Sequence, residues 1–280
     1  WENNHDGYGS FQDLEGATVE DVAAFHRDYY GPNNAVLSIA GDVTAEEGFA
    51  LAEKYFGGIA ARPTPPRPDV SEPINTGEKR ITQPDALAQV PALAVGWKIA
   101  ERGSPDHAPI AVLAEVLAGG DASRAYQGLV KGREMAINGQ YLFGLTSPWE
   151  FDGPTLLTFF ALYKPQFSAD QLLAALDEEI ARIAEEGVGD EELARVKTRM
   201  LADWNNGMES FLGRADTLAR LQAIWGDAAV ANQIPGWIDA VDSEDLQRVA
   251  RTYLTAQNRT VIDRKPAAML EAAANAAGQE

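Results

Sequence analysis

The sequence predicts an α+β fold in which an antiparallel sheet is covered by helices on one face. The order of the segments is the first reason: pairs of strand-like segments come before a long run of helix-like segments instead of alternating with them. A second reason is a helix–turn–strand pattern that occurs twice. Residues 20–36 and 244–260 align without a gap, and an internal repeat constrains the architecture before any local pattern does.

The two copies of this repeat share residue types at equivalent positions. The identical pairs are Glu20/Glu244, Asp21/Asp245, Arg27/Arg251, Tyr29/Tyr253 and Asn34/Asn258. The first copy lies near the start of the sequence and the second near its end. If the copies mark equivalent places in homologous domains, the first domain is short of roughly 150 residues on its N-terminal side.

The first predicted segment, residues 1–61, contains two amphipathic helices and one strand. Each helix begins at a capping box, in which a threonine is followed three positions later by an acid. The two pairs are Thr18 with Asp21 and Thr44 with Glu47. Between the helices, the apolar residues 35–40 predict a buried strand. We therefore interpret residues 1–61 as the C-terminal part of a first domain.

A proline-rich linker is predicted at residues 62–75, which contain five prolines. Dense proline disfavours both helices and central strands and favours extended chain. A complete second domain is predicted at residues 76–266, followed by an Ala-rich tail at residues 267–280.

The second domain begins with strand patterns. Residues 90–99 alternate clearly, so that Leu93, Val95 and Trp97 face one side. Residues 155–163 are apolar on both faces, which predicts a central strand. The other predicted strands are residues 79–83, 136–145 and 259–264.

The predicted helices of this domain follow from caps and apolar stripes. One begins at Asp106 and ends before Gly119-Gly120, and another runs from Asp121 or Ser123 to about Val130. Stripes of period 3.6 predict a helix over residues 172–183 and a second one between Gly189 and about Gly213. Ser243 is the predicted cap of the repeated helix.

Composition excludes several classes of function. The formal net charge is −19, which disfavours contact with a nucleic-acid backbone and predicts no nucleic-acid partner. No apolar run is long enough for a membrane span. The chain has no cysteine, so disulfides, thiol catalysis and Cys-ligated metals are excluded; this absence fits the cytosol and the periplasm equally.

Residue patterns alone predict neither a catalytic residue nor a metal ligand. The three histidines, His5, His26 and His107, have no i, i+4 spacing for zinc, and we interpret all three as surface residues. No Ser-His-Asp arrangement and no phosphate-binding glycine motif is present.

Four motifs nevertheless resemble one family of zinc metallopeptidases, that of insulinase, pitrilysin and the mitochondrial processing peptidase. The first is Tyr-Tyr-Gly-Pro-Asn-Asn-Ala at residues 29–35, which closes on Gly41-Asp42. The others lie at residues 53–59, 89–97 and 123–130. The resemblance covers about residues 11–265 and implies a metallohydrolase-type repeated domain, with one complete copy and the C-terminal part of a preceding copy.

The resemblance also implies an activity for the whole protein. Two halves of such peptidases close like a clamshell around unfolded peptides, and an inverted His-x-x-Glu-His motif on a helix of the first domain binds zinc. The motif's Glu is the general base for the zinc-bound water. This chain contains no such motif. We therefore expect no cofactor in the chain itself, zinc in the parent protein or a partner, and no peptidase activity of the chain alone.

A substrate-binding pair is the other functional feature that the resemblance implies. It consists of an Arg and a Tyr seven positions apart in the half without zinc, and alignment through residues 123–129 places it on Val130 and Ile137. Arg133 and Tyr141 lie nearby but out of register, and we take them as candidate substrate-binding residues. The alternative interpretation is a solvated loop arginine and a strand aromatic.

Two hypotheses for function follow. In the first, the chain is the non-zinc C-terminal part of a peptidase and supplies chamber wall and peptide-binding surface. In the second, it belongs to a non-catalytic partner or assembly subunit of a heteromeric complex. The expected partners are peptide substrates and either the rest of the peptidase or a homologous subunit. The sequence leaves the cellular location undetermined, and resemblance to bacterial members favours the periplasm.

Overall fold

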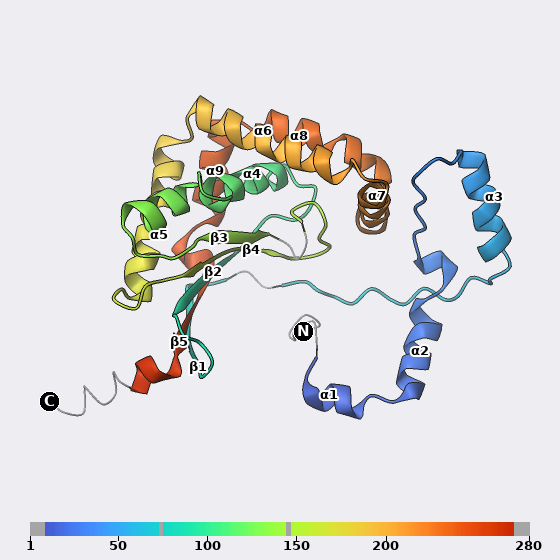
Figure 1. The fold of residues 1–280 in the computed structure, drawn as a ribbon, viewed down its shortest axis with the longest axis horizontal. Helices are drawn as coiled ribbons and strands as arrows, with labels where there is room; N and C mark the ends of the chain where they lie inside the picture. The colour runs from blue at the N-terminus through green and yellow to red at the C-terminus, as the bar shows by residue number, and fades with distance from the viewer. Residues whose placement is uncertain (1–8, 73–74, 144–146, 272–280) are drawn as a thin grey trace. The chain divides into compact units, whose positions relative to one another are not determined.

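The structure is a computed structural model that describes residues 9–72, 75–143 and 147–271. The chain divides into two compact units, whose helices and strands are labelled in Figure 1. One consists of Trp1–Ser71 with Asp203–Gln233, and the other of Glu72–Ala202 with Ile234–Glu280. The boundary at Ser71 falls inside the predicted linker 62–75, but the first unit also takes in a later segment. The division into two homologous domains therefore stays a prediction.

A five-stranded sheet is the centre of the second unit, with strand order β1-β5-β2-β4-β3. The strands are β1 (Lys79–Asp85), β2 (Ala92–Lys98), β3 (Gln140–Phe143), β4 (Leu156–Leu162) and β5 (Arg259–Pro266). Neighbours pair antiparallel except β1 and β5, which are parallel. A parallel pair needs a long connection, and most of the second unit lies between these two strands.

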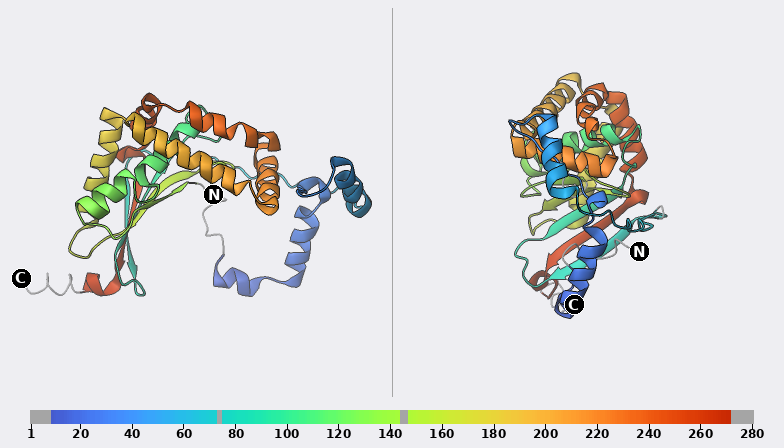
Figure 2. Two further views of the ribbon diagram at one scale, coloured as in Figure 1. Left: turned by 45° about the horizontal axis from the view of Figure 1, so that its top comes forward. Right: turned by 90° about the vertical axis from the view of Figure 1, so that its right-hand side faces the viewer.

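Helices cover one face of this sheet, as the two views in Figure 2 also show. They are α4 (His107–Ala118), α5 (Ala169–Glu186), the first part of α6 (Asp190–Gly207), α8 (Ile234–Ala240) and α9 (Ser243–Tyr253). Helix α9 packs against both α4 and α5. The predicted α+β class, with a sheet covered by helices, is confirmed, and β1 is a parallel addition to an otherwise antiparallel sheet.

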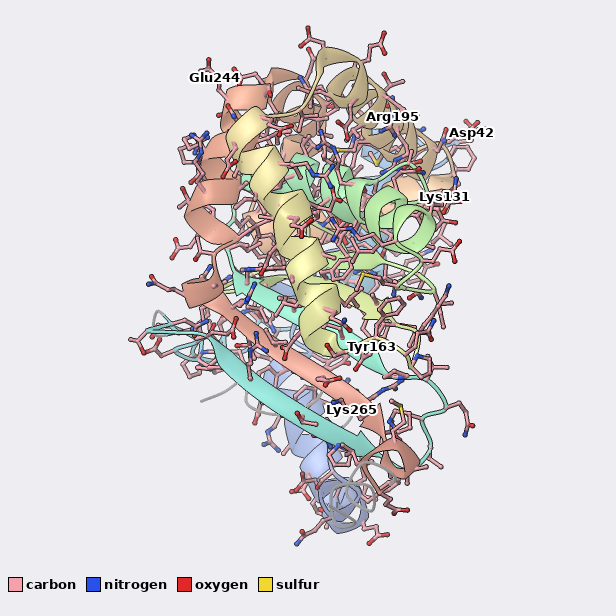
Figure 3. The ribbon with its side chains drawn as sticks, turned by 90° about the vertical axis from the view of Figure 1, so that its left-hand side faces the viewer. Asp42, Lys131, Tyr163, Arg195, Glu244 and Lys265 are labelled. Atoms are coloured by element: carbon pink, nitrogen blue, oxygen red, sulfur yellow. The ribbon has the colours of Figure 1, made fainter. Side chains whose placement is uncertain are left out.

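The core of the second unit lies between the sheet and these helices. Leu93, Val95 and Trp97 are fully buried, which confirms the predicted alternation of this strand. Strand β4 is an internal strand, as its two apolar faces indicate. Beyond its end, the hydroxyl of Tyr163 (labelled in Figure 3) donates to Asp263 Oδ1 at 2.7 Å and ties β4 to β5. Burial, together with this bond, raises the pKa of Tyr163.

Several element boundaries in the second unit differ from the predictions. The predicted strand 136–145 is only a bridge between Ala136 and Tyr163 followed by β3, and its predicted end lies outside the described residues. The helix predicted to end near Val130 is a π-helix, Tyr126–Gly132. Asp242, and not the predicted Ser243, caps α9, because its side chain accepts from the Asp245 amide. The Ser243 hydroxyl accepts a hydrogen bond from the Val188 amide at 2.8 Å.

The helix predicted between Gly189 and Gly213 is also interrupted. Helix α6 ends at Gly207, and α7 (Phe211–Trp225) begins after Ser210, whose hydroxyl accepts from the Gly213 amide at 2.9 Å. A serine cap competes effectively with a continuous helix because it satisfies an amide that has no partner in the first turn. Helix α7 packs against the 3-10 helix η3 (Ala228–Asn232) of the same unit.

The first unit also contains the helices α1 (Phe11–Gly16), α2 (Val19–Tyr29) and α3 (Ala45–Phe56), with a 3-10 turn η1 (Pro32–Asn34) after α2. Both predicted capping boxes are present: the amides of Asp21 and Glu47 each donate to a threonine hydroxyl at 3.2 Å. No residue of α1, α2 or α3 is buried.

The prediction of a buried strand at residues 35–40 is wrong for this structure. These residues carry no strand pairing, and Leu37 is 57 % exposed. A strand forms only where a neighbouring strand accepts its hydrogen bonds, and the described sheet consists of β1 to β5 alone.

None of the helices in the described ranges is long and apolar enough to cross a membrane.

Candidate functional site

Arg133 lies at the end of the π-helix Tyr126–Gly132. Its backbone amide donates to the Gly128 carbonyl at 3.0 Å, and its guanidinium pairs with the carboxylate of Glu178 on α5. This bond lowers the pKa of Glu178, so the acid stays ionised beside the arginine. The Arg133 side chain keeps 36 % of its surface exposed. It can therefore reach an incoming ligand if it exchanges or shares this partner.

The next residue, Glu134, has a positive φ of 52°, which is uncommon for a residue with a side chain. The chain reverses here, because the amides of Met135 and Ala136 both donate to the Leu129 carbonyl. Backbone in this region is held by its surroundings and is frequent at binding sites. These two hydrogen bonds fix the position of the backbone that follows Arg133.

Tyr141 lies on β3 and belongs to a three-residue network. Its hydroxyl donates to the carboxylate of Glu115 on α4, and that carboxylate also pairs with Arg199 on α6. Arg199 in addition donates to the Gly119 carbonyl at the end of α4. The network thus connects the sheet to two helices of the layer above it.

Arg133 and Tyr141 have different hydrogen-bond partners in the structure. Each is held by a separate acid, Glu178 for Arg133 and Glu115 for Tyr141. Of the positions that the alignment selects, Val130 is half-buried in the π-helix and Ile137 is 50 % exposed. A direct substrate contact by Arg133 or Tyr141 therefore stays a prediction.

The acid next to Glu178 on α5, Glu179, is buried. Glu179 is 2 % exposed and pairs with Arg182, and burial raises its pKa despite the nearby arginines. Gly128 lies beside it, and a Cβ at that position would displace the Glu179 carboxylate. The π-helix that carries Gly128 also carries Lys131 (labelled in Figure 3), whose ammonium lies 5.6 Å from the centre of the Tyr126 ring.

A bidentate pair anchors the start of this helix. The Arg124 guanidinium donates to both carboxylate oxygens of Glu192 on α6, at 2.8 and 2.6 Å. Two parallel bonds of this kind fix orientation as well as distance. The segment that presents Arg133 is therefore held by α5 at one end and by α6 at the other.

The prediction that His107 is a surface residue is wrong. It is 2 % exposed, its Nε2 lies 2.7 Å from the Pro148 carbonyl, and its Nδ1 accepts from the Gly103 amide. Burial lowers its pKa, which favours the neutral ring among its aromatic neighbours. These neighbours are Phe143, Trp149 and Phe151. These three aromatic rings enclose His107 in the core.

Of the other two histidines, the structure describes His26. His26 is exposed on α2 as predicted and stacks on Tyr30, with ring centres 5.0 Å apart, whereas His5 lies outside the described residues. Across residues 9–72, 75–143 and 147–271, no three His, Cys, Asp or Glu side chains converge closely enough to hold a metal ion.

In chemical terms, the site offers hydrogen-bond donors. An arginine and a tyrosine can bind carbonyl or carboxylate oxygens of a peptide, and their partners are acids committed to ion pairs. Sequence reasoning missed Glu115, Glu178 and Arg199. For Glu115 there was a signal, because it is the only acid in the otherwise apolar α4. The other two lie on charged helix faces and carry no such signal.

Comparison with known proteins identifies a related family. The family model described as the Peptidase M16 inactive domain matches residues 16–200. The "Zinc protease PqqE" of Helicobacter pylori is 23 % identical over 266 residues, which cover 92 % of this chain and 57 % of the relative. The "Probable mitochondrial-processing peptidase subunit beta, mitochondrial" of Arabidopsis thaliana is 22 % identical over 252 residues, covering 88 % of this chain and 47 % of the relative.

Solved structures agree with the fold. A protease from Helicobacter pylori superposes with a TM-score of 0.83 at 22 % identity, covering 92 % of this chain and 62 % of that one. A peptidase M16 inactive domain from Pseudomonas fluorescens superposes with a TM-score of 0.78 at 16 % identity, covering 94 % and 60 %. The chain spans about half the length of the curated relatives that it matches.

Proposed function

Because this chain belongs to the M16 peptidase family, whose inactive domain it contains, we propose that it supplies chamber wall and peptide-binding surface to a zinc metallopeptidase. The observation that carries the proposal is the match of residues 16–200 to that inactive domain, together with relatives named zinc proteases. The catalytic zinc would belong to another part of the parent protein, on the inverted His-x-x-Glu-His motif.

The proposal assigns a role to each part of the chain. Residues 1–61 are the C-terminal part of a first peptidase domain, 62–75 a linker, 76–266 a complete second domain and 267–280 a tail. The repeated helix and turn support this assignment, since equivalent segments occur near the end of each proposed domain. The second domain would confine the peptide, and Arg133 and Tyr141 would contact it.

A second candidate function is that of a non-catalytic subunit in a heteromeric peptidase. The similarity to a mitochondrial-processing peptidase subunit supports this alternative. In that case the parent protein would contain the first domain without the zinc motif, and a homologous partner would supply the metal.

One experiment distinguishes the two functions. We expect the pure 280-residue chain to show no zinc-dependent turnover of an unfolded fluorogenic peptide, because it has no His-x-x-Glu-His motif. We expect the gene to encode that motif within roughly 150 codons upstream, and the longer product to cleave the peptide with zinc. Turnover by the 280-residue chain would contradict the first expectation. A longer product without the motif, recovered together with a zinc-bearing relative, would favour the subunit.

The substrate contact has its own test. Replacing Arg133 with alanine is expected to weaken binding of a labelled unfolded peptide by about fivefold, the effect of about 1 kcal/mol from one lost hydrogen bond. Tyr141→Phe should act similarly, because it removes the hydroxyl and leaves the pair between Glu115 and Arg199. Fluorescence anisotropy with the 280-residue chain measures both variants.

The control for these variants is Lys131→Ala, which removes a cation from the π-helix that ends at Arg133 and should leave peptide binding unchanged. Equal affinity of the wild-type chain and both test variants would assign Arg133 and Tyr141 purely structural roles.

A further inference from the structure

The ring of His107 connects two loops of the sheet-containing unit. Its Nε2 lies 2.7 Å from the Pro148 carbonyl in residues 147–151, and its Nδ1 lies 3.3 Å from the Gly103 amide nitrogen in residues 101–105. A carbonyl can only accept and a backbone N–H can only donate, so the ring is neutral and carries its proton on Nε2. Both bonds therefore depend on one protonation state of one side chain.

Protonation of the ring removes one of these bonds. A charged imidazole carries a hydrogen on both nitrogens, so Nδ1 would face the Gly103 amide as a second donor. The bond between them is then lost, and the buried charge has no acceptor on that side. Acid therefore acts directly on the attachment of residues 101–105 to the ring.

The surroundings of the ring also disfavour its charged form. Burial lowers the pKa of His107; the bond to Pro148 acts against burial, and the positive charge of Arg102 acts with it. Three aromatic rings pack around the imidazole, those of Phe143, Trp149 and Phe151. A ring released to water escapes this penalty, so it binds a proton more readily than the enclosed ring does.

The acids near His107 already have cationic partners. The pairs are Asp106 with Arg248, Asp152 with Arg102, Asp245 with Arg248, and Glu115 of α4 itself with Arg199. The other titratable side chains on the surrounding segments are Glu101, Tyr141, Glu150, Asp239, Asp242, Glu244 and Tyr253. A proton on His107 would thus add a second positive charge close to Arg102, which is unfavourable.

The closed loop leaves space beside it and a polar atom unpaired. A cavity of about 340 Å³ adjoins the loop, and it is lined by Gly103, Ser104 and Pro105 together with Trp237 of α8 and Val241. The Ser104 hydroxyl is buried without a hydrogen-bond partner among the described residues. When the loop opens, water can reach this hydroxyl, which offsets part of the free energy lost with the bond to His107.

We propose that His107 is a pH-operated clasp, which holds residues 101–105 closed at neutral pH and releases them when acid protonates the ring. The clasp consists of the His107 ring and its two backbone partners, Gly103 and Pro148. Phe143 of β3 packs on the same ring, with ring centres 6.1 Å apart, so the release extends to the end of the strand that carries Tyr141. This inference is independent of the proposed function.

Hydrogen exchange of the 280-residue chain, measured by mass spectrometry at pH 7 and pH 5, tests the clasp. Dividing each rate by the intrinsic exchange rate at the same pH leaves the protection that is due to structure. Protection within residues 103–107 should fall by about ten- to thirtyfold at pH 5. About thirtyfold is the ratio of charged to neutral imidazole at pH 5 for a released ring with the ordinary pKa of about 6.5. Amides 93–97 of β2 are the internal control and should keep their protection.

The variant His107→Gln separates the titration of the ring from its shape. Glutamine is neutral at both pH values; its amide can donate to the Pro148 carbonyl and its oxygen can accept from Gly103. Protection within residues 103–107 should then be equal at pH 5 and pH 7. The matched control is His26→Gln, which replaces an exposed histidine on α2 and should show the same loss in acid as the wild-type chain.

An NMR titration of the wild-type chain gives a readout that needs no stable variant at residue 107. The chain has three histidines, so His5→Gln and His26→Gln assign the imidazole signal of His107 by elimination. This signal should titrate below the ordinary pKa of histidine, and residues 103–107 should lose protection over the same pH range.

Three results would overturn the clasp. The first is protection within residues 103–107 that stays constant from pH 7 to pH 5. The second is an equal loss of protection in His107→Gln, since acid would then act through another group. The third is a parallel loss at amides 93–97, which would show global unfolding in place of a local opening.

Discussion

Replacing Trp97 with alanine is expected to lower the free energy of unfolding of the sheet-containing unit by about 3–5 kcal/mol. Trp97 lies on β2, the strand paired on both edges, and its side chain is fully buried. Truncation removes a large apolar surface from the core and leaves a cavity that a paired strand cannot collapse to fill. Urea unfolding followed by far-UV circular dichroism measures the change.

Two further variants make this result interpretable. Trp97→Phe should be milder, because the indole Nε1 is buried without a hydrogen-bond partner among the described residues, so little is lost with it. Phe49→Ala, at a position that is 75 % exposed on α3, should change the unfolding free energy by less than about 0.5 kcal/mol. A Trp97→Ala protein as stable as the wild type would show that β2 is not central to the core.

Replacing Arg259 with methionine is expected to destabilise the same unit by about 3 kcal/mol, the lower end of the range for breaking a buried ion pair. The Arg259 side chain is only 7 % exposed and pairs with Glu78 and with Asp177 of α5, the latter at 2.6 Å. Methionine fills a similar volume but leaves both acids without this partner. The effect stays near the lower end because Glu78 keeps its pair with Arg80 and Asp177 is 44 % exposed.

The destabilisation by Arg259→Met should depend on pH, because Glu78 is a partner of Arg259. Burial acts to raise the pKa of Glu78, but bonds from Arg80 and Arg259 outweigh it and lower that pKa. An acid whose pKa is lowered by folding stabilises the native state above its unfolded pKa and loses that contribution as the pH falls through its folded value. Arg259→Met should therefore cost less stability at pH 3 than at pH 7. Arg251→Ala, an exposed arginine on α9, is the control and should have little effect at either pH.

Local chemistry explains which parts of the fold were predictable. Capping boxes, alternation in β2 and the apolar stripe of α5 depend on residues a few positions apart, so the chain itself specifies them. The break between α6 and α7 was missed although Ser210 and Gly213 were visible, because the apolar stripe continues across it. The 3.6-residue period of apolar side chains does not by itself show where a cap interrupts a helix.

The candidate site was less predictable, since its contacts join distant segments. Tyr141, Glu115 and Arg199 lie on β3, α4 and α6, and only the packing of these elements brings them together. His107 was misjudged for the same reason. Its position near a helix start suggests exposure, but the loop carrying Pro148 and Trp149 closes over it.

By itself, the sequence determined the family, the α+β class and the doubled helix and turn, because these follow from local patterns and from a match along the chain. Only the tertiary structure decided which copy of the repeat is covered and which acids hold Arg133 and Tyr141. The physical reason is that burial and ion pairing depend on neighbours far apart in the chain. Residues 35–40 and 259–264 share an extended pattern, yet a strand forms only where β1 and β2 lie alongside.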